Sequence, residues 1–206
     1  MKRILIAATA VLALAACNKK TDATAASDTG AVSDTATSTP STTAPDGTAL
    51  SGAAPAVASA PAGPDFVAMA AASDMYEVQA AKIAQKKSKN ADVKAFAAMM
   101  ITDHGKSTAM IKKAVADSGR TDITPPTALP ADKQAMIDAL NAASPADFDK
   151  TYVDQQVMAH KDALGLMTAY STGGDTPQLK DAAGMIVPVV QMHLDHITTI
   201  QTSLTK

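Results

Sequence analysis

Cysteine is almost absent from this chain of 206 residues, and tryptophan is entirely absent. The single cysteine, Cys17, lies near the N-terminus, so disulfides and cysteine-based metal sites or catalysis are excluded from the rest of the chain. Aromatic residues make up only 3% of the sequence. Methionine, with 11 residues, is interpreted first of all as flexible core filler.

An excess of one charge and the common catalytic motifs are also missing. The 18 Lys and Arg side chains nearly balance 20 Asp and Glu, so the sequence has no electrostatic footprint for nucleic acid. It contains no Gly-x-Ser-x-Gly elbow, no Walker or dinucleotide glycine pattern and no Cys-x-x-Cys pair. Glutamate occurs once, at Glu77, so the paired carboxylates of a glycosidase are not expected in the core.

The first 16 residues have the pattern of an export signal. Lys2 and Arg3 provide a positive start, and residues 4–16 form an apolar run too short to span a bilayer as a stable helix. The run ends in Leu-Ala-Ala-Cys17, which resembles the lipobox of bacterial lipoproteins. This resemblance implies that Cys17 is lipidated and becomes the mature N-terminus. An ordinary cleaved signal and an uncleaved anchor are the alternatives.

The resemblance to lipoproteins also bears on location. In Gram-negative lipoproteins, an aspartate after the cysteine retains the protein at the inner membrane, and Asn18 stands there in this chain. The resemblance therefore implies a periplasm-facing lipoprotein of the outer membrane, if the cell has one.

Residues 17–64 are interpreted as the lipidated cysteine and a disordered tether. The composition is Thr, Ala, Ser, Pro, Gly and Asp, with almost no large apolar side chain. Such a segment cannot bury enough surface to offset its conformational entropy. It is expected to link the lipid to a folded domain, with O-glycan attachment as an alternative role.

Residues 65–206 are predicted to form one all-α domain. The region is rich in Ala and Met, and no stretch alternates with period two over the length of a strand. Long helices are predicted at about 64–87, from about 88–90 to 118, from Ser144 to about 173, and from Thr176 onward. Pro145 and Pro177 are the expected first residues of the last two. Their short first and last loops predict a four-helix bundle, with an extra short helix at about 132–142 between the second and third long helices.

Apolar residues recur every three or four positions in each long helix and define its core-facing row. In the last helix, the apolar row leaves one position to be filled by His193. The four predicted rows are Phe66, Ala70, Ser73, Glu77, Ala80 and Ala84; Val93, Ala97, Met100, His104, Ser107, Ile111 and Ala114; Val153, Val157, His160, Leu164 and Met167; and Leu179, Ile186, Val190, His193, Ile197, Ile200 and Leu204.

The rows place one polar residue of each long helix near its middle: Glu77, His104, His160 and His193. Because antiparallel helices share their midplane, these four side chains are expected to meet at one level of the core. His196 follows His193 by about one turn and lies near the same face. Imidazoles and a carboxylate form a ligand set for a transition metal such as Zn, Cu, Fe or Mn. We therefore predict a metal site made by these four residues, with His196 as a further candidate ligand.

Two aspartates flank this group. Asp103 and Asp195 directly precede His104 and His196, and each points about 100° away on its helix. They are predicted to accept hydrogen bonds from the imidazole of a neighbouring helix rather than to bind metal directly.

The same residues allow other interpretations. A buried Glu, His and Asp layer can hydrogen-bond across a bundle and fix its register without binding anything. A small-ligand pocket is a second alternative, and Met100, Met167 or Met192 could act as soft copper ligands.

A set of motifs resembles one bacterial family. The motifs are Glu77 in the first helix, Phe96-Ala-Ala-Met-Met-Ile-Thr-Asp103-His104 in the second, Phe148-Asp149-Lys-Thr-Tyr152 with His160 in the third, and Pro188 with His193 in the fourth. Over nearly all of residues 65–206 the chain resembles the ferritin-like family called domain of unknown function 4142. The resemblance implies a ferritin-like four-helix bundle exported to the cell envelope, with no settled activity.

Di-iron chemistry does not fit the residues present. Di-iron members of the wider ferritin-like fold use about four glutamates and two Glu-x-x-His pairs. Here His104 and His160 both lack a glutamate three residues earlier. A mononuclear or non-catalytic site fits better than ferroxidase or oxygenase chemistry.

These observations predict an envelope-anchored lipoprotein whose helical bundle binds a transition metal, for storage, buffering or stress protection rather than fast catalysis. The main alternative is a structural or interaction module with an architectural polar layer. An exposed apolar stripe on the short connector helix would favour the module, and a solvent-open pocket at the histidine level would favour the metal site. A redox enzyme, the third alternative, would need a metal with an open coordination position.

Overall fold

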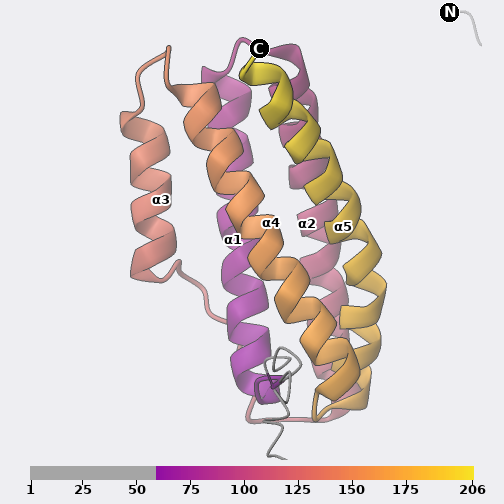
Figure 1. Cartoon of the computed structure of the whole chain (residues 1–206). Helices are drawn as coiled ribbons and strands as arrows, with labels where there is room; N and C mark the ends of the chain where they lie inside the picture. The colour runs from indigo at the N-terminus through magenta and orange to yellow at the C-terminus, as the bar shows by residue number, and fades with distance from the viewer. Residues whose placement is uncertain (1–58) are drawn as a thin grey trace, which may run out of the picture. The chain divides into compact units, whose positions relative to one another are not determined.

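The computed structural model describes residues 59–206, which form five α-helices and contain no strand (Figure 1). The helices are α1 (Gly63–Lys87), α2 (Ala91–Ser118), α3 (Ala131–Ala142), α4 (Phe148–Gly173) and α5 (Pro177–Leu204). The all-α prediction is confirmed for this part of the chain. The predicted signal at 1–16, the lipidation site Cys17 and the tether as far as residue 58 lie outside the described residues. Within the described range, none of the helices combines the length and the apolar character needed to cross a bilayer.

The four long helices pack against one another in the order α1, α2, α5, α4, and α4 also contacts α1. Figure 1 shows α1 and α5 running in one direction and α2 and α4 in the other, so each of these neighbouring pairs is antiparallel. Because α2 and α4 run in the same direction, the chain must return along the whole length of the helices between them. The connection is therefore a long crossover rather than a compact loop, which the sequence had left open.

Helix α3 lies in this crossover and packs against α1 and α4 (Figure 1). The Nζ of Lys87, in the last turn of α1, donates hydrogen bonds to the carbonyl oxygens of Leu140, Asn141 and Ala143 at 2.9, 2.7 and 2.9 Å. This lysine satisfies carbonyl groups at the C-terminal end of α3 that have no partner within the helix. Ile137 and Leu140 are buried against the long helices, so α3 presents no stripe of large apolar side chains to solvent.

The ends of α2 agree with the prediction. The side chain of Asn90 accepts hydrogen bonds from the backbone N–H groups of Asp92 and Val93 at 2.8 and 3.1 Å, which caps the helix. At the other end, Gly119 has φ 69°, in the left-handed region that a residue without a Cβ adopts most readily.

The start of α4 was predicted three residues too early. The helix begins at Phe148, and Pro145 lies in a turn that precedes it. Ser144 does act as a cap for this turn, since its Oγ accepts from the N–H of Asp147 at 3.2 Å and its carbonyl accepts from the N–H of Phe148 at 2.9 Å. The N–H of Asp147 also donates to the Ser144 carbonyl at 3.1 Å, a bond between residues three apart, so residues 145–147 form a turn tighter than an α-helix.

Asp175 joins three parts of the fold just before α5. Its carboxylate accepts hydrogen bonds from the backbone N–H of Gly63 at 3.1 Å, the Tyr170 hydroxyl at 2.8 Å and Arg120 Nη1 at 3.3 Å. Helix α5 begins at Pro177 with Thr176 at the N-cap position, as predicted. The Thr176 hydroxyl makes no capping hydrogen bond and donates to Asp175 at 2.8 Å. Asp175 thus ties the start of α1 and the chain after α2 to the turn between α4 and α5.

The core consists of two apolar clusters. One surrounds Phe96 and Tyr152, and the other surrounds Phe66 and Tyr170, whose rings stack with centroids 3.8 Å apart. Between them lie the buried polar side chains of Asp74, Glu77, His104, Gln156, His160 and His193, which we call the polar layer. Every residue of the predicted α2 row is buried; in the other rows, Ser73 and Leu164 are only partly buried and Leu204 is exposed.

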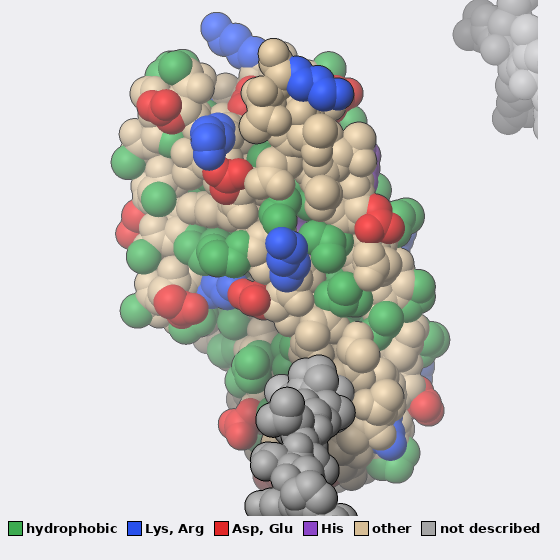
Figure 2. All heavy atoms as spheres, viewed as in Figure 1, with side chains coloured by type: hydrophobic (Ala, Val, Ile, Leu, Met, Phe, Trp, Pro, Cys, Tyr) green, Lys and Arg blue, Asp and Glu red, His purple; other side chains and the backbone are tan. Residues whose placement is uncertain are grey.

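The face of the molecule in Figure 2 shows Lys and Arg side chains interspersed with Asp and Glu, while histidine is scarcely visible. This distribution agrees with the near balance of charges in the sequence and with the burial of most of the histidines.

Two glycines should respond in opposite ways to alanine. Gly119→Ala places a Cβ in a left-handed conformation and should lower the free energy of unfolding by about 1–2 kcal/mol. Gly165→Ala, at an exposed position of α4 where an added Cβ meets nothing within 4 Å, should raise it by about 0.5–1 kcal/mol. Urea denaturation of both variants checks this prediction, and the same sign for both would contradict it.

Asp175→Asn should lower the melting temperature at pH 7 by roughly 2–4 °C. The hydrogen bonds from Gly63 N–H, Tyr170 and Thr176 hold the pKa of Asp175 far below its ordinary value. A depressed folded-state pKa stabilises the fold above the unfolded-state pKa of about 3.9, and this stability is lost as the pH falls further. The difference in melting temperature between the parent and the variant should therefore narrow below about pH 4. Thermal melts at pH 7, 5 and 3 measure this difference, and a difference that stays constant would refute the stabilising role of the ionised Asp175 carboxylate.

Candidate metal centre

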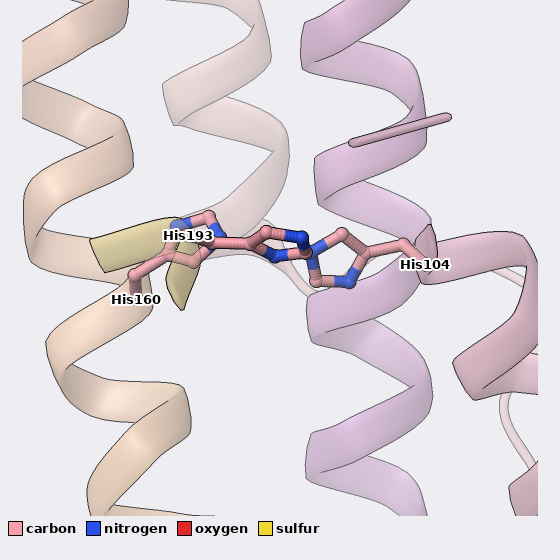
Figure 3. A group of neighbouring side chains, drawn as sticks. All are labelled: His104, His160 and His193. Carbon is pink, nitrogen blue, oxygen red and sulfur yellow. The ribbon is translucent and has the colours of Figure 1, made fainter. Parts of the chain in front are cut away.

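Three histidines from three helices meet in the polar layer. His104 comes from α2, His160 from α4 and His193 from α5, and all three are buried. Their ring centroids are 5.7, 5.8 and 5.5 Å apart, close to an equilateral triangle. The rings point toward one another (Figure 3), and one ring nitrogen of each lies within 4.8 Å of the others.

Each imidazole has one nitrogen held by an acceptor behind it. His104 Nδ1 lies 2.8 Å from Asp74 Oδ1, His160 Nδ1 lies 2.9 Å from the Gln156 carbonyl oxygen, and His193 Nε2 lies 3.2 Å from Asp103 Oδ2. Carbonyl oxygens and ionised carboxylates can only accept, so these ring nitrogens carry the protons and donate. The partners therefore fix the tautomer of each ring.

The opposite nitrogens have no hydrogen-bond partner among the described residues. They are His104 Nε2, His160 Nε2 and His193 Nδ1, all three buried. In the neutral tautomers each is an acceptor with a free lone pair, and three acceptors cannot hydrogen-bond to one another. The arrangement calls for a cation or a proton donor at its centre.

The surroundings keep two of the rings neutral. Burial lowers the pKa of His160 to about 3, with the nearby His104 acting in the same direction. Burial also lowers the pKa of His193, although its hydrogen bond with Asp103 opposes the change. For His104, burial opposes protonation, but the hydrogen bond with Asp74 and the charge of Glu77 outweigh it and raise the pKa. His104 is therefore the ring where a proton competes most strongly with a metal.

The spacing of the three rings is compatible with a metal site. Metal–imidazole bonds of about 2.0–2.1 Å place ligand nitrogens roughly 3.3–3.6 Å apart. Here one nitrogen of each ring lies within 4.8 Å of the other two, which is close enough for the three rings to share one ion. The acceptors behind the rings fit the usual arrangement in which a carboxylate or carbonyl orients a metal-binding histidine.

A small cavity of about 20 Å³ adjoins the histidines and is partly open to solvent. His104, His193, Asp74 and Asp103 are among its lining residues, and His160 is not. A solvent-open pocket at this level is the feature expected to favour a metal site over a purely structural module.

Glu77, a predicted ligand, is buried in the polar layer but is not one of the three grouped residues. Its Oε1 is 3.8 Å from His160 Nδ1, which is the nitrogen that bonds to the Gln156 carbonyl. Glu77 therefore lies beside the outward edge of His160. Burial raises the pKa of Glu77 to about 7, with His104 and Gln156 opposing the shift.

His196 and Asp195, also predicted for the site, lie elsewhere. His196 is exposed and packs against the edge of the Phe96 ring, with centroids 5.6 Å apart. Asp195 is exposed and accepts from Gln191 Nε2 at 2.8 Å, which is a contact within its own helix. The predicted role of Asp103 as an acceptor for an imidazole of a neighbouring helix corresponds to its contact with His193.

Asp74 also belongs to the site, although the core-facing row predicted for α1 does not include it. It binds His104 through Oδ1 and accepts from the Thr108 hydroxyl through Oδ2 at 2.9 Å. The signal was present, because Asp74 precedes Glu77 by three residues and follows Ala70 by four, so it shares the core-facing side of α1. The predicted row used Ser73 instead, which is only partly buried.

The fold and the site define an all-helical domain with a buried cluster of three histidines, preceded by a match to the prokaryotic membrane lipoprotein lipid attachment site at residues 1–18. That match supports a membrane-anchored location in the cell envelope through a lipid at Cys17. Residues 48–200 match the family described as domain of unknown function, DUF4142, and the chain belongs to that family. Comparison with curated proteins finds no match.

Three solved structures share the fold. CopM in its Cu(I)-bound form has a TM-score of 0.59 and 15% identity, over 71% of this chain and 99% of that one. CopM in its Cu(II)-bound form has a TM-score of 0.60 and 16% identity, over 70% of this chain and 99% of that one. A DUF305 fragment from Deinococcus radiodurans has a TM-score of 0.60 and 11% identity, over 70% of this chain and 98% of that one. At these identities the likeness concerns the fold alone.

His160→Leu should leave the metal-free protein as stable as the parent or more stable, within about 1 kcal/mol. The substitution removes a buried nitrogen that has no partner in the described structure and keeps an apolar side chain in its place. Because the pKa of His160 is lowered to about 3, the unfolded state gains a proton there first as the pH falls. The advantage of the variant should therefore grow from pH 7 to pH 5. Denaturation in the presence of a chelator tests this, and a loss above about 2 kcal/mol would indicate a layer held together by hydrogen bonds.

Proposed function

We propose that this envelope lipoprotein binds a transition metal ion between His104, His160 and His193. The observation that carries the proposal is the set of three buried ring nitrogens, each without a partner in the described residues and each an acceptor when its ring is neutral. A cation satisfies all three lone pairs at once. The acceptors behind the rings supply the orientation and negative charge that such an ion requires.

Copper is the first candidate for the ion and zinc the second. Imidazole ligands suit Cu and Zn, whereas Mn prefers carboxylate and water oxygens. The shared fold with CopM, which was solved in Cu(I)- and Cu(II)-bound forms, supports copper. We do not include Glu77 and His196 in the proposed ligand set, because Glu77 lies at the outward edge of His160 and His196 is exposed.

The cellular role that fits this site is metal storage, buffering or protection against metal stress. A lipid on Cys17 would hold the domain at the periplasmic face of the outer membrane, as Asn18 suggests for a Gram-negative cell. The antiparallel neighbours and the long crossover support a ferritin-like four-helix bundle. Fast catalysis is not part of the proposal.

The alternative is a structural or interaction module whose polar layer only fixes helix register. The hydrogen bonds that His104 donates to Asp74 and that His193 donates to Asp103 support it, because they join α1 to α2 and α2 to α5. This alternative does not account for the three inward nitrogens, since a register-fixing layer has no need of facing acceptors.

Metal content measured by mass spectrometry tests the proposal. The full-length lipoprotein, without a histidine tag, is purified from membranes in detergent and incubated separately with Cu, Zn, Fe and Mn salts. We expect about one ion per chain in the parent and none in the His104→Ala/His193→Ala double variant. At 100 times its dissociation constant, the bound ion should also add about 2.7 kcal/mol to the stability of the parent.

His196→Ala is the matched control, since it removes an exposed histidine one turn from His193. It should retain the metal content of the parent. A parent that takes up no ion from any of the four salts would disprove the metal function, and loss of metal in His196→Ala would disprove the ligand set.

A further inference from the structure

The cavity next to His104 and His193 has a size that corresponds to one water molecule. Its volume is about 20 Å³, and a site needs roughly 10–15 Å³ to hold a water. Because His160 does not line it, the cavity adjoins the point between the three free nitrogens and does not coincide with it.

Ser107 gives this cavity a polar wall. It follows His104 by three residues on α2 and therefore lies on the same face of the helix. Its Oγ is buried and, within the part of the chain that the structure describes, has no hydrogen-bond partner. A buried hydroxyl without a partner costs on the order of 1–3 kcal/mol, so a ligand in the cavity would satisfy it.

The charges around the cavity indicate the kind of ligand. The carboxylates of Asp74 and Asp103 both line it, and they disfavour an anion while accepting hydrogen bonds from a donor. A ligand that offers a lone pair to a metal and donates protons to oxygen acceptors fits these surroundings. Water has this chemistry and this size.

We infer that a metal bound by the three histidines keeps a fourth position, which faces this cavity and takes one exchangeable water molecule that donates to Ser107 Oγ. The inference rests on the proposed metal function. The buried thioether of Met167 also lines the cavity and is the competing fourth ligand. A site of this kind can exchange its fourth ligand with solvent, which a site closed by four protein ligands cannot do.

Water-proton relaxation tests the inference. The full-length protein in detergent is loaded with Cu(II), which is paramagnetic, or with Zn(II) as the diamagnetic reference, and its metal content is measured first. The longitudinal relaxation of bulk water should be faster with the Cu(II) protein, because a water that exchanges at the ion carries the effect into the solvent.

Two substitutions locate the exchanging water. Ala163 lines the cavity, so Ala163→Val fills part of it and should abolish the enhancement while the copper content is unchanged. Ala109→Val, at an exposed position of α2, is the matched control and should leave the enhancement intact. Ser107→Ala removes only the hydroxyl and should reduce the enhancement by less than Ala163→Val does. An enhancement unchanged in Ser107→Ala would show that Ser107 Oγ is not the acceptor for this water.

The failures of the two proposals can be told apart. A parent that binds copper stoichiometrically but relaxes water no faster than the zinc form would overturn the open position and leave the metal function intact. A changed copper EPR spectrum in Met167→Leu, together with that result, would assign the position to the thioether. Absence of bound copper would overturn both proposals.

Discussion

The structure depends on how three imidazoles place their protons. Each ring donates its single proton outward, to Asp74, Asp103 or the Gln156 carbonyl, and is left with a lone pair that faces the other two rings. Since two of these acceptors belong to different helices from the rings they hold, the proton positions also constrain how α1, α2 and α5 lie against one another. The inward lone pairs and the helix register are therefore consequences of the same hydrogen bonds.

The two apolar clusters, one on each side of the polar layer, fix the position of that layer along the helices. Phe96 belongs to one cluster and borders the layer, with its ring steeply inclined to those of His160 and His193, at centroid distances of 5.9 and 6.3 Å. Sliding α2, α4 or α5 by one turn would move its histidine into one of the clusters, where the nitrogens could neither meet nor reach their acceptors. Burial of apolar surface and satisfaction of the polar groups thus favour the same arrangement, as expected of a sequence that specifies one fold.

Much of this arrangement could be predicted from the sequence, because helical periodicity is a local property. Every residue predicted for the α2 row is buried, although the row left out the buried Phe96. The three histidines that meet were all found as interruptions of apolar rows. The features that the sequence did not predict depend on a rotation of one residue around a helix or on contacts between distant segments. Asp74 differs from Ser73 by one step around α1, and His196 lies near the face of His193 yet remains exposed. The crossover between α2 and α4 leaves no trace in periodicity, since either connection fits the same rows.

The connectivity has a consequence for assembly of the molecule. The short turns make α1–α2 and α4–α5 two separate hairpins, joined only through the long segment that contains α3. His104 belongs to the first hairpin, whereas His160 and His193 belong to the second. The first hairpin alone can offer one imidazole and the second can offer two, so the triad comes into being only when the hairpins dock. An ion held by all three rings would act as a cross-link between the halves and slow their separation. The rate at which the protein releases its ion would then report the rate at which the two hairpins come apart.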